Sequence, residues 1–492
     1  MTRPEPRPAP APAPGQRGGA QPRAVFPGSA DFGPYAFRRG AAHVVRYLNP
    51  TANKPLHLGH LRNIALGTAI AGSMRALGID AVRHCVIEDT GRWMCEAMAA
   101  FAELKRAGTA DAAVHGHRKP DQFVGAIYAR HRRALREARA GAAAAGPGYD
   151  VRDDAADDLQ RALLDGAREA RALRDEVKAL ALAGQQATLR RLGATFDHCD
   201  YESVEDVLLA DFVGDGLRAG IFAANADGEV VYANSSRLLM RMVNRLGLYE
   251  ESARLLCYLR RRLRDWPPDC VNVIVAGSEW KGWMDFYPEI LARFGIVHAR
   301  AMYAHAFYGM VRLDGRKMAS SAGPGVLVDD LLDELADSGL AQTIAGECGL
   351  FSDAVAATAV KAFLLAVPRV RAIDYAEHRV KDPASNRGWA VARAWGRCRG
   401  SDATVAPGAL EALREALTRL SFERAVAMAG RLADRVLAGE ASADEAAAFV
   451  ALTKALGLAP EHSDFAYAAA PPLPAALDPP AVDGSRDRMV SS

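Results

Sequence analysis

Residues 49–60 read N-P-T-A-N-K-P-L-H-L-G-H, and the pattern on either side of this stretch predicts a strand, a loop and a helix. The apolar run His43–Leu48 indicates a strand, and a helix is expected from about Leu61, with Gly78 as its stop. This helix carries an apolar face at Leu66, Ile70, Met74 and Leu77. Ala81–Ile87 then predicts a second strand. Such a strand–helix–strand unit is typical of a doubly wound α/β domain, whose ligands bind at the carboxyl ends of the strands.

The loop itself has the layout of a phosphate-binding element. His57 and His60 lie at positions i and i+3 where the helix begins, so both imidazoles can point the same way. Gly59 leaves room for a nucleotide, and a helix N-terminus favours negative charge. The two rings would then donate hydrogen bonds to ATP phosphates as charge builds at the α-phosphorus. Taken alone, H-x-G-H is equally compatible with coincidence or with a metal-binding pair.

A second motif lies far downstream, where residues 315–325 read G-R-K-M-A-S-S-A-G-P-G. It combines a lysine, two hydroxyl groups and flanking glycines. Alone it is compatible with an ordinary surface turn. Placed after a second half-sheet and opposite the H-L-G-H loop, it would instead close over a triphosphate.

The chain divides into two tails, a catalytic core and a helical end. Residues 1–38 and 466–492 are rich in proline and alanine, which predicts disorder. Residues 39–335 are expected to form a Rossmann-type domain with a helical insertion at about 108–192. Val271–Ala276 reads as a buried parallel strand and is followed by Gly277, so the α/β domain resumes after the insertion.

Residues 336–465 are expected to form a shortened helical bundle, because the strand pattern stops after about residue 340. Helical spacing is clearest at Phe422, Val426, Ala429, Ala433 and Val436.

Composition narrows the class of protein. The 492 residues suffice for roughly two to four domains. A content of 50% hydrophobic and 24% charged residues is typical of a soluble globular protein, and no run approaches the ~18 apolar residues of a membrane span. No secretory signal precedes the core, which predicts a cytoplasmic protein.

Seven scattered cysteines without a C-x-x-C pair argue against a disulfide framework and a zinc knuckle, so no metal site is predicted. A net charge of +2 neither demands nor excludes a nucleic-acid partner.

H-L-G-H followed by K-M-A-S-S resembles the paired signature motifs of class I aminoacyl-tRNA synthetases. The sequence around these motifs, over residues 43–400, is most similar to that of arginyl-tRNA synthetases. The similar segments are N-P-T and L-R-N beside the first motif, V-I-E-D-T-G-R at 86–92, K-P-D-Q-F-V-G-A-I-Y at 119–128, V-L-V-D-D-L-L-D-E at 326–334 and V-K-A-F-L-L at 360–365. Relative to that family, the chain is expected to be truncated at both ends.

The resemblance implies activation of an amino acid by ATP with Mg²⁺ and assigns site residues. The catalytic set is His57, His60, Lys54 and Lys317. The ATP-binding set is Gly59, Gly277, Glu279, Met318, Ser320 and Ser321, with Gly277 and Glu279 matching a Gly-x-Asp turn that holds the ribose. Ser320 stands where the motif usually has a second lysine, and Lys54 matches a lysine of members that lack it.

The amino-acid pocket departs from the family. The resemblance places Asn49, Arg46, Asp89 and Tyr249 there. Arg46 stands where arginyl enzymes carry a glutamate, which would reverse the charge beside a guanidinium. In the segment that begins at Tyr249, Arg254 persists and Leu255 replaces an aspartate. Both departures put arginine as the substrate in doubt.

A candidate RNA-binding face follows from helical spacing at Arg387, Trp389, Arg393 and Arg397, since arginine binds phosphates and aromatic rings stack on bases. A solvated basic face explains the same pattern.

Three functions are compatible with these features. The first is an arginine-tRNA ligase, or a paralogue that charges another amino acid, acting as a monomer; this family characteristically needs tRNA for activation. The second is a tRNA-independent ligase that transfers the aminoacyl group to a small-molecule amine. The third is a non-catalytic RNA-binding or regulatory paralogue.

Overall fold

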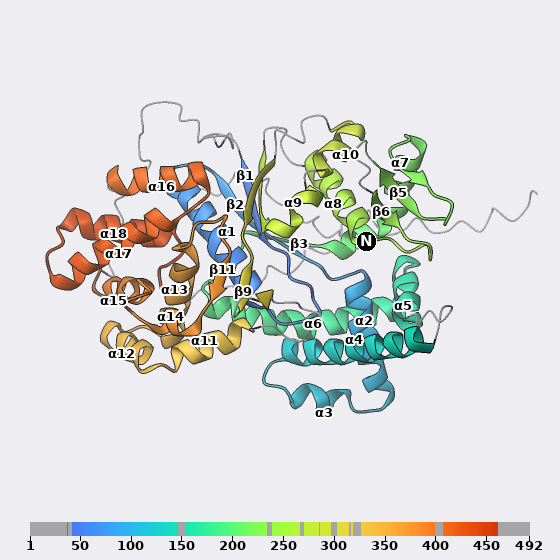
Figure 1. The fold of residues 1–492 in the computed structure, drawn as a ribbon, viewed down its shortest axis with the longest axis horizontal. Helices are drawn as coiled ribbons and strands as arrows, with labels where there is room; N and C mark the ends of the chain where they lie inside the picture. The colour runs from blue at the N-terminus through green and yellow to red at the C-terminus, as the bar shows by residue number, and fades with distance from the viewer. Residues whose placement is uncertain are drawn as a thin grey trace, which may run out of the picture.

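The structure is a computed structural model that describes residues 37, 42–145, 153–233, 239–265, 270–284, 286–296, 303–313, 316–317, 326–398 and 407–460. Apart from Phe37, both predicted tails lie outside these ranges. A five-stranded parallel sheet of order β3-β2-β1-β7-β8 lies at the centre (Figure 1). Its strands are β1 (His43–Leu48), β2 (Ala81–Ile87), β3 (His198–Tyr201), β7 (Val271–Gly277) and β8 (Tyr303–Tyr308).

Alternate residues of these strands enter two separate hydrophobic cores. Val45 and Val273 contribute to one core, and Val44 and Ile274 to the other. The helix α1 (Leu58–Ala76) covers the first face, and α8 (Glu251–Asp265) and α10 (Tyr287–Arg293) cover the second. The doubly wound α/β fold expected from the sequence is therefore confirmed. Strand order reverses beside β1 and β7, and in such sheets ligands bind outside the carboxyl ends of strands at this point.

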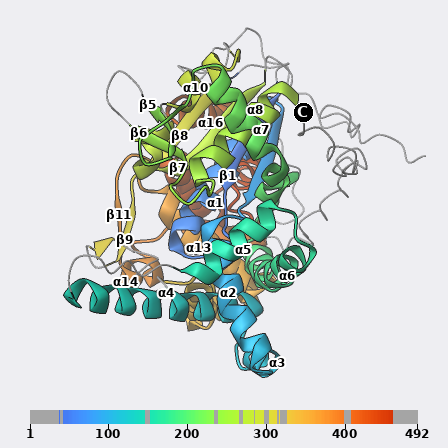
Figure 2. The ribbon, with the colours of Figure 1, turned by 90° about the vertical axis from the view of Figure 1, so that its right-hand side faces the viewer.

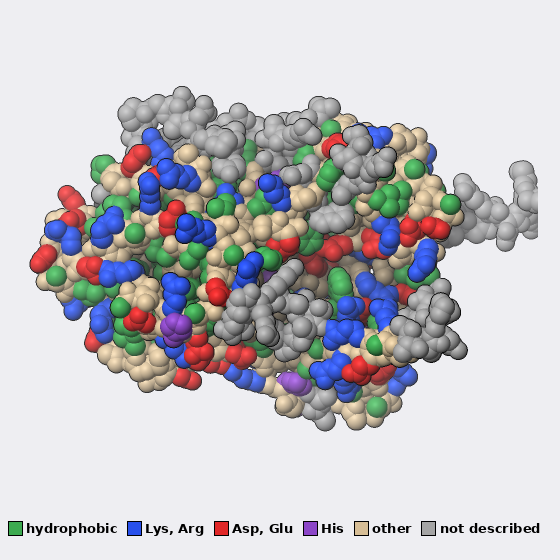
Figure 3. Space-filling view, viewed as in Figure 1, with side chains coloured by type: hydrophobic (Ala, Val, Ile, Leu, Met, Phe, Trp, Pro, Cys, Tyr) green, Lys and Arg blue, Asp and Glu red, His purple; other side chains and the backbone are tan. Residues whose placement is uncertain are grey.

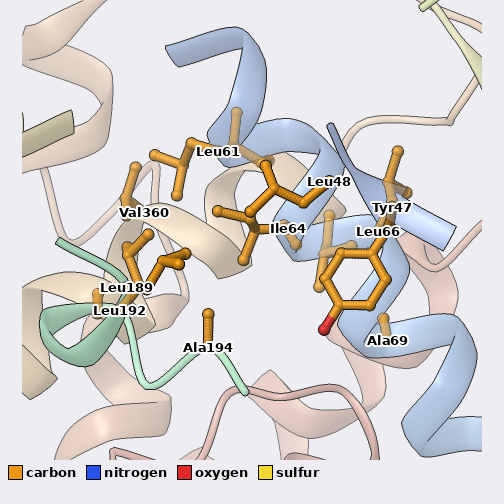
Figure 4. Packing of buried hydrophobic residues seen from close by; sticks show 14 of the residues in the cluster. Tyr47, Leu48, Leu61, Ile64, Leu66, Ala69, Leu189, Leu192, Ala194 and Val360 are labelled. Carbon is orange, nitrogen blue, oxygen red and sulfur yellow. The ribbon is translucent and has the colours of Figure 1, made fainter. Parts of the chain in front are cut away.

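Helix α1 is more deeply enclosed than its predicted single apolar face implies. Twelve of its residues are buried, because α1 lies between the sheet and helices from the far end of the chain. Figure 4 shows Leu61 and Ile64 packed close to Val360, Leu189 and Leu192. At Gly72 a Cβ atom would lie 2.2 Å from the carbonyl oxygen of Ala455. The close approach of the C-terminal helices to α1 therefore requires glycine here.

The region between β2 and β3 is helical, as the sequence predicts. Its helices lie below the sheet in Figure 1, and in Figure 2 α4 extends to the lower left while α3 lies lowest. They are α2 (Arg92–Arg106), α3 (Ala110–His115), α4 (Pro120–Ala145), α5 (Asp154–Leu164) and α6 (Arg168–Arg191). Asp329 ties this region to the C-terminal part: its fully buried carboxylate pairs with Lys119 and Arg191 and accepts from Thr188 Oγ1 at 2.8 Å.

Between β3 and β7 the described chain forms a small antiparallel sheet and three helical segments, of which α8 was named above. The other elements are η2 (Glu202–Leu208), α7 (Leu209–Arg218), β4 (Ala223–Ala224), β5 (Val230–Ala233) and β6 (Leu239–Val243). After β7 come the short helices η3 (Ser278–Trp280) and α9 (Lys281–Met284).

A third sheet joins the end of the α/β core to the C-terminal helical part. It consists of β10 (Arg316–Lys317), β9 (Val311–Leu313) and β11 (Ile373–Tyr375), in that order. Ile373 pairs with Val311 in parallel register. The expectation that strands stop after residue 340 is therefore wrong, because β11 is set by a distant partner strand and not by its own pattern.

The C-terminal part otherwise consists of helices, and the five residues predicted to form an apolar face from Phe422 to Val436 are all buried. Within the described residues no single helix is long and apolar enough to span a membrane. One pair of helices, Gly339–Cys348 and Ser352–Leu365, meets that test only when the two are taken together, and the chain bends by 114° between them. The helices are α11 (Val328–Ala336), α12 (Gly339–Cys348), α13 (Ser352–Leu365), α14 (Glu377–Lys381), α15 (Gly388–Cys398), α16 (Pro407–Arg419), α17 (Glu423–Ala438) and α18 (Ala443–Ala455).

Candidate active site

A cavity of about 210 Å³ opens where β1 and β7 end, at the reversal of strand order. Its walls include predicted site residues from both halves of the sheet, namely Arg46, Asn49, His57, Gly59, His60, Gly277 and Glu279. In Figure 3 acidic side chains gather in the hollow at the middle of the visible face. The structure therefore brings the first signature and the predicted ribose-binding turn to one cavity.

His57 and His60 form a reciprocal cap on the first turn of α1. Nδ1 of His57 accepts from the backbone N–H of Gly59 at 3.2 Å, and Nδ1 of His60 accepts from that of His57 at 3.1 Å. The two rings are stacked with centroids 3.9 Å apart. Because each Nδ1 acts as an acceptor, hydrogen-bond geometry assigns the proton to Nε2 in both rings. Each imidazole can therefore donate from Nε2.

Both rings are neutral at physiological pH. Burial and the nearby Lys54 lower the pKa of His57 to about 4. Burial, followed by His57 and Lys54, holds the pKa of His60 well below its usual value. Neutral rings add no repulsion toward a lysine beside them, and they still supply two hydrogen-bond donors to an anion.

The chain just after the second signature is hydrogen-bonded to the first. The N–H of Leu58 donates to the carbonyl of Val326 at 3.1 Å, and the N–H of Val328 donates to that of Leu56 at 3.0 Å. These bonds flank a bridge between His57 and Leu327. At the other end of the loop, Lys317 pairs with Arg312 in the hairpin of β10 and β9. The side chain of Lys317 and the residues Met318, Ser320 and Ser321 lie outside the described part; of the chain that flanks them, residues 326–328 pair with the first signature and residues 316–317 pair with β9.

The turn after β7 places Glu279 against Gly277. A Cβ atom at Gly277 would lie 2.2 Å from Oε2 of Glu279, so the carboxylate folds back over the strand end. Tyr308 from β8 lines the same side of the cavity, and its hydroxyl donates to the carbonyl of Gly59 at 3.4 Å. Burial and Glu279 raise the pKa of Tyr308. The predicted ribose-binding turn therefore lies across the cavity from the histidine pair.

Lys54 lies behind the histidine pair. Burial lowers the pKa of its ammonium group, and Glu88 and Glu251 act against that change. Its backbone is held by Gln185, whose Nε2 donates to the carbonyl of Lys54 at 2.8 Å. Gly125 of α4 permits the close approach, because a Cβ atom there would lie 2.7 Å from Cδ of Pro55. The insertion thus fixes the loop that carries Lys54.

Arg46 is buried at 6% exposure, and its guanidinium carbon lies 5.6 Å from the ring centre of Tyr258. The same cavity contains three carboxylates that sequence reasoning did not assign, namely Glu88, Glu202 and Glu251. Two of them lay beside residues that were noted, Glu88 within V-I-E-D-T-G-R and Glu251 two residues after Tyr249. Glu202 had no local signal. The cavity therefore remains rich in acidic side chains although Arg46 replaces a glutamate.

Two predicted amino-acid contacts lie elsewhere. Asp89 is fully buried and lines neither this cavity nor its neighbour. Its carboxylate pairs with Lys178 at 3.1 Å and accepts from the N–H and hydroxyl of Ser203 at 2.8 Å each. The assignment of Asp89 as a substrate contact is wrong, because these internal donors occupy it. Tyr249 lines an adjoining cavity of about 380 Å³, and burial raises the pKa of its hydroxyl.

The predicted RNA-binding face on α15 is largely turned toward other helices. Trp389 is 2% exposed and donates from Nε1 to the carbonyl of Val380 at 2.9 Å. It cannot stack on a base, so this prediction is wrong. The three arginines of the set have protein partners: Arg387 pairs with Asp434, Arg393 pairs with Glu347, and Arg397 donates to the carbonyl of Leu437.

One group of possible metal ligands lies outside the cavities. Nitrogen and oxygen atoms of His84, His198 and Asp200 lie within 4.8 Å of one another. The carboxylate of Asp200 also pairs with Arg262 and accepts from the hydroxyl of Tyr258 at 2.8 Å. Because an arginine already neutralises this carboxylate, the group forms an ion-pair network between α8 and the sheet.

The raised pKa of the buried Glu88 carboxyl group predicts that the folded protein becomes less stable as the pH rises. Burial and then Glu251 raise its pKa to about 7, whereas the unfolded chain titrates near 4.5. Between these values the folded state binds more protons than the unfolded state, so stability falls as pH rises through this window. Relative to Glu88→Gln, the free energy of unfolding of the wild type should fall by about 1–3 kcal/mol between about pH 4.5 and 7.5, measured by urea denaturation. A difference that does not vary with pH would contradict this assignment.

Comparison with known proteins places these features in one family. Residues 35–382 match the family model described as tRNA synthetases class I (R), catalytic domain. The arginine–tRNA ligase of Amoebophilus asiaticus is 31% identical over 306 residues, which cover 60% of this chain and 50% of that protein. That of Treponema denticola is 27% identical over 354 residues, covering 68% of this chain and 56% of the relative. The chain thus spans about half the length of the curated relatives it matches.

Solved structures agree in fold. The arginyl-tRNA synthetase of Thermus thermophilus superimposes with a TM-score of 0.57 at 21% identity, over 89% of this chain and 82% of that one. The Plasmodium falciparum enzyme superimposes with a TM-score of 0.58 at 13% identity, over 87% and 78% of the two chains. Together with the family match over most of its length, this means that the chain belongs to the arginyl-tRNA synthetase family of class I tRNA synthetases.

Proposed function

We propose that this protein activates arginine with ATP and transfers it to tRNA, as an arginine–tRNA ligase. The observation that carries the proposal is the backbone pairing of residues 56–58 with residues 326–328, because it holds the residues just after the second signature beside the first. A monomeric state and a cytoplasmic location remain predictions.

In the first step the carboxylate of the amino acid attacks the α-phosphorus of ATP, and the bond to pyrophosphate breaks. His57 and His60 would donate from Nε2 to the phosphate oxygens as charge builds there. Lys54 behind them, and Lys317 on the loop, would supply positive charge. In the second step a ribose hydroxyl of the tRNA attacks the carbonyl carbon, its proton is lost, and AMP leaves. Positioning and charge stabilisation account for most of this chemistry.

Mg²⁺ would enter with ATP. Its preferred ligands are oxygen atoms, which the phosphates of ATP supply. When bound, the ion neutralises charge on the departing pyrophosphate.

The test is exchange of labelled pyrophosphate into ATP for each of the twenty amino acids, with and without total tRNA. The proposal expects exchange with arginine that appears when tRNA is added. Exchange without tRNA would point to the small-amine ligase, exchange with a different amino acid to a paralogue of altered specificity, and none at all to a non-catalytic protein.

For the tRNA we propose a contact surface on α4, the α4 face, made of Arg130, Arg132, Arg133, Arg136 and Arg139. Four of these arginines are exposed. Arg132 and Arg139 line the larger cavity, and the guanidinium carbon of Arg132 lies 4.9 Å from the ring centre of the half-exposed Trp93. Figure 3 shows basic side chains gathered over the insertion at the lower right. Arginine beside an accessible aromatic ring suits a single-stranded RNA end.

The combined variant Arg130→Gln, Arg133→Gln, Arg136→Gln should bind tRNA more weakly. The slope of log binding constant against log salt concentration should fall in magnitude by about 2–3, since each phosphate contact contributes roughly 0.7–0.9. Filter binding across salt concentrations measures this slope. The matched comparison replaces Arg387, which precedes α15, and Arg393 and Arg397 on α15, the remaining proposed RNA contacts. A larger change in this second variant would move the RNA surface to the C-terminal helices.

A further inference from the structure

Three carboxylates stand where the two cavities meet. Glu88 follows β2, Glu202 begins η2 and Glu251 begins α8, and each of them lines both cavities. Segments far apart in the sequence thus place three acids at one junction. A substrate in the smaller cavity would have a part directed toward this junction.

Glu202 is the most unusual of the three. Its side chain is only 5% exposed, and no hydrogen bond or ion pair reaches its carboxylate from the described residues. Neighbouring acids of η2 are satisfied: Glu205 accepts from Nε of Arg261 at 2.9 Å, and Asp206 accepts from Thr90 at 2.7 Å. With little access to water and no donor from the described residues, this carboxylate is poorly satisfied, and the cavities that it lines leave room for a ligand that brings a donor.

Nearby cations do not meet this need. Arg254 forms an ion pair with Asp206 at 3.4 Å and donates a hydrogen bond to the carbonyl of Tyr249 at 2.9 Å. Arg46 faces the ring of Tyr258, and no ion pair joins it to any of the three acids in the described structure. Lys54 lies behind the histidine pair.

The three acids disfavour one another's ionised form. Burial raises the pKa of each acid, and mutual repulsion adds to the effect at Glu88 and Glu202. Arg46, Lys54 and Arg254 offset these increases only in part, so a cationic ligand at the junction would favour the ionised acids.

We propose that Glu202 is the counter-charge for a cationic group of the amino acid substrate, with Glu88 and Glu251 as its supporting acids. This inference rests on the proposed function and names the residue that selects its substrate. Arg46 then does not repel a cationic substrate, because its charge is already offset by the surrounding acids. A guanidinium offers several N–H donors in one plane and matches carboxylates in pairs, and an α-ammonium group offers the same charge at a point.

The experiment is calorimetric titration of the full chain with arginine and with citrulline, which has the same shape without the side-chain charge. Glu202→Gln should weaken arginine binding about 10- to 100-fold, as expected for loss of a charge-assisted hydrogen bond. An undiminished affinity of this variant for citrulline identifies the guanidinium as the partner. An equal loss for citrulline identifies the α-ammonium group. Binding of arginine by Glu202→Gln as tight as by the wild type overturns the proposal.

Glu250→Gln is the matched control, because Glu250 lines only the larger cavity and accepts from Asn244 at 3.2 Å. It should leave arginine binding within about twofold, as expected for an exposed substitution. Glu251→Gln should weaken binding in the same direction as Glu202→Gln but less, since Glu251 is more exposed to solvent than Glu202. Glu202→Gln removes a buried charge and should melt no lower than the wild type, so a folding defect would be visible by thermal unfolding.

Pyrophosphate exchange on the same samples separates this proposal from the proposed function. Arginine binding that depends on Glu202 without any exchange would leave the counter-charge assignment intact and reject adenylation. Exchange with a neutral amino acid, unaffected by Glu202→Gln, would retain adenylation and reject the counter-charge.

Discussion

Replacing His60 with alanine is expected to slow amino-acid-dependent pyrophosphate exchange by about 100- to 1,000-fold, the usual cost of losing one donor to a transition-state anion. The reason is the tautomer imposed by the helix cap: Nδ1 of His60 accepts the N–H of His57, so its Nε2 is left as a donor in the cavity. Because the pKa of His60 lies well below neutrality, the rate should not depend on a histidine titration above about pH 6. Steady-state exchange from about pH 6 to 8 measures both effects.

The same substitution also removes part of a capping box, which costs roughly 1 kcal/mol of stability. Ser442→Ala is the matched control, since Ser442 and Glu445 form a capping box of the same kind on α18, far from the cavity. It should lose similar stability and keep the wild-type exchange rate. An equal fall in rate for Ser442→Ala would show that His60 acts through stability alone.

Asp329→Ala is expected to lower the free energy of unfolding by about 3–5 kcal/mol, as for other broken buried ion pairs. Asp329 is fully buried and is shared by Lys119 and Arg191, at 13% and 18% side-chain exposure. Its removal takes the carboxylate that Lys119 and Arg191 share, and leaves Lys119 with Asp121 at 3.4 Å and Arg191 with Asp333 and Asp353. Chemical denaturation monitored by circular dichroism measures the change.

Asp330→Ala is the comparison for this prediction, because the neighbouring Asp330 is exposed. Its effect should stay within about 0.5 kcal/mol, as for most surface substitutions. Equal losses in the two variants would mean that helix α11 itself, rather than the buried ion pairs, is sensitive to substitution.

The parts of the fold that the sequence predicts are those that depend on local pattern. The bounds of β1 and β2 follow from apolar runs beside turn residues, and the predicted ranges agree with the structure. The strand β11 and the second buried face of α1 depend on partners more than 60 residues away in the chain, β9 and α18, and no local pattern encodes them.

The residues of the candidate site likewise fall into those that a local motif identifies and those that only the tertiary structure identifies. His57, His60, Gly277 and Glu279 were found because short motifs carry them. Glu202 was not, since its importance arises from burial without a partner, which only tertiary structure reveals. Trp389 was misassigned because tryptophan and arginine at helical spacing fit an RNA surface and a helix-packing surface equally well. The internal acceptor Val380 and the acids Asp434 and Glu347 decide in favour of packing for that residue and its neighbours.

The sheet of β10, β9 and β11 has a consequence for dissecting the molecule. Its first two strands lead into the second signature loop, while its third belongs to the C-terminal helices. The fully buried Arg62 of α1 adds a second tie, donating to the carbonyl of Arg369 at 3.1 Å. A cut at the apparent boundary near residue 335 would therefore expose an open strand edge beside the signature loop. Designs that join a foreign C-terminal domain to this core must retain residues 369–375 as part of the core, because the boundary between the two parts falls within a sheet to which both contribute strands.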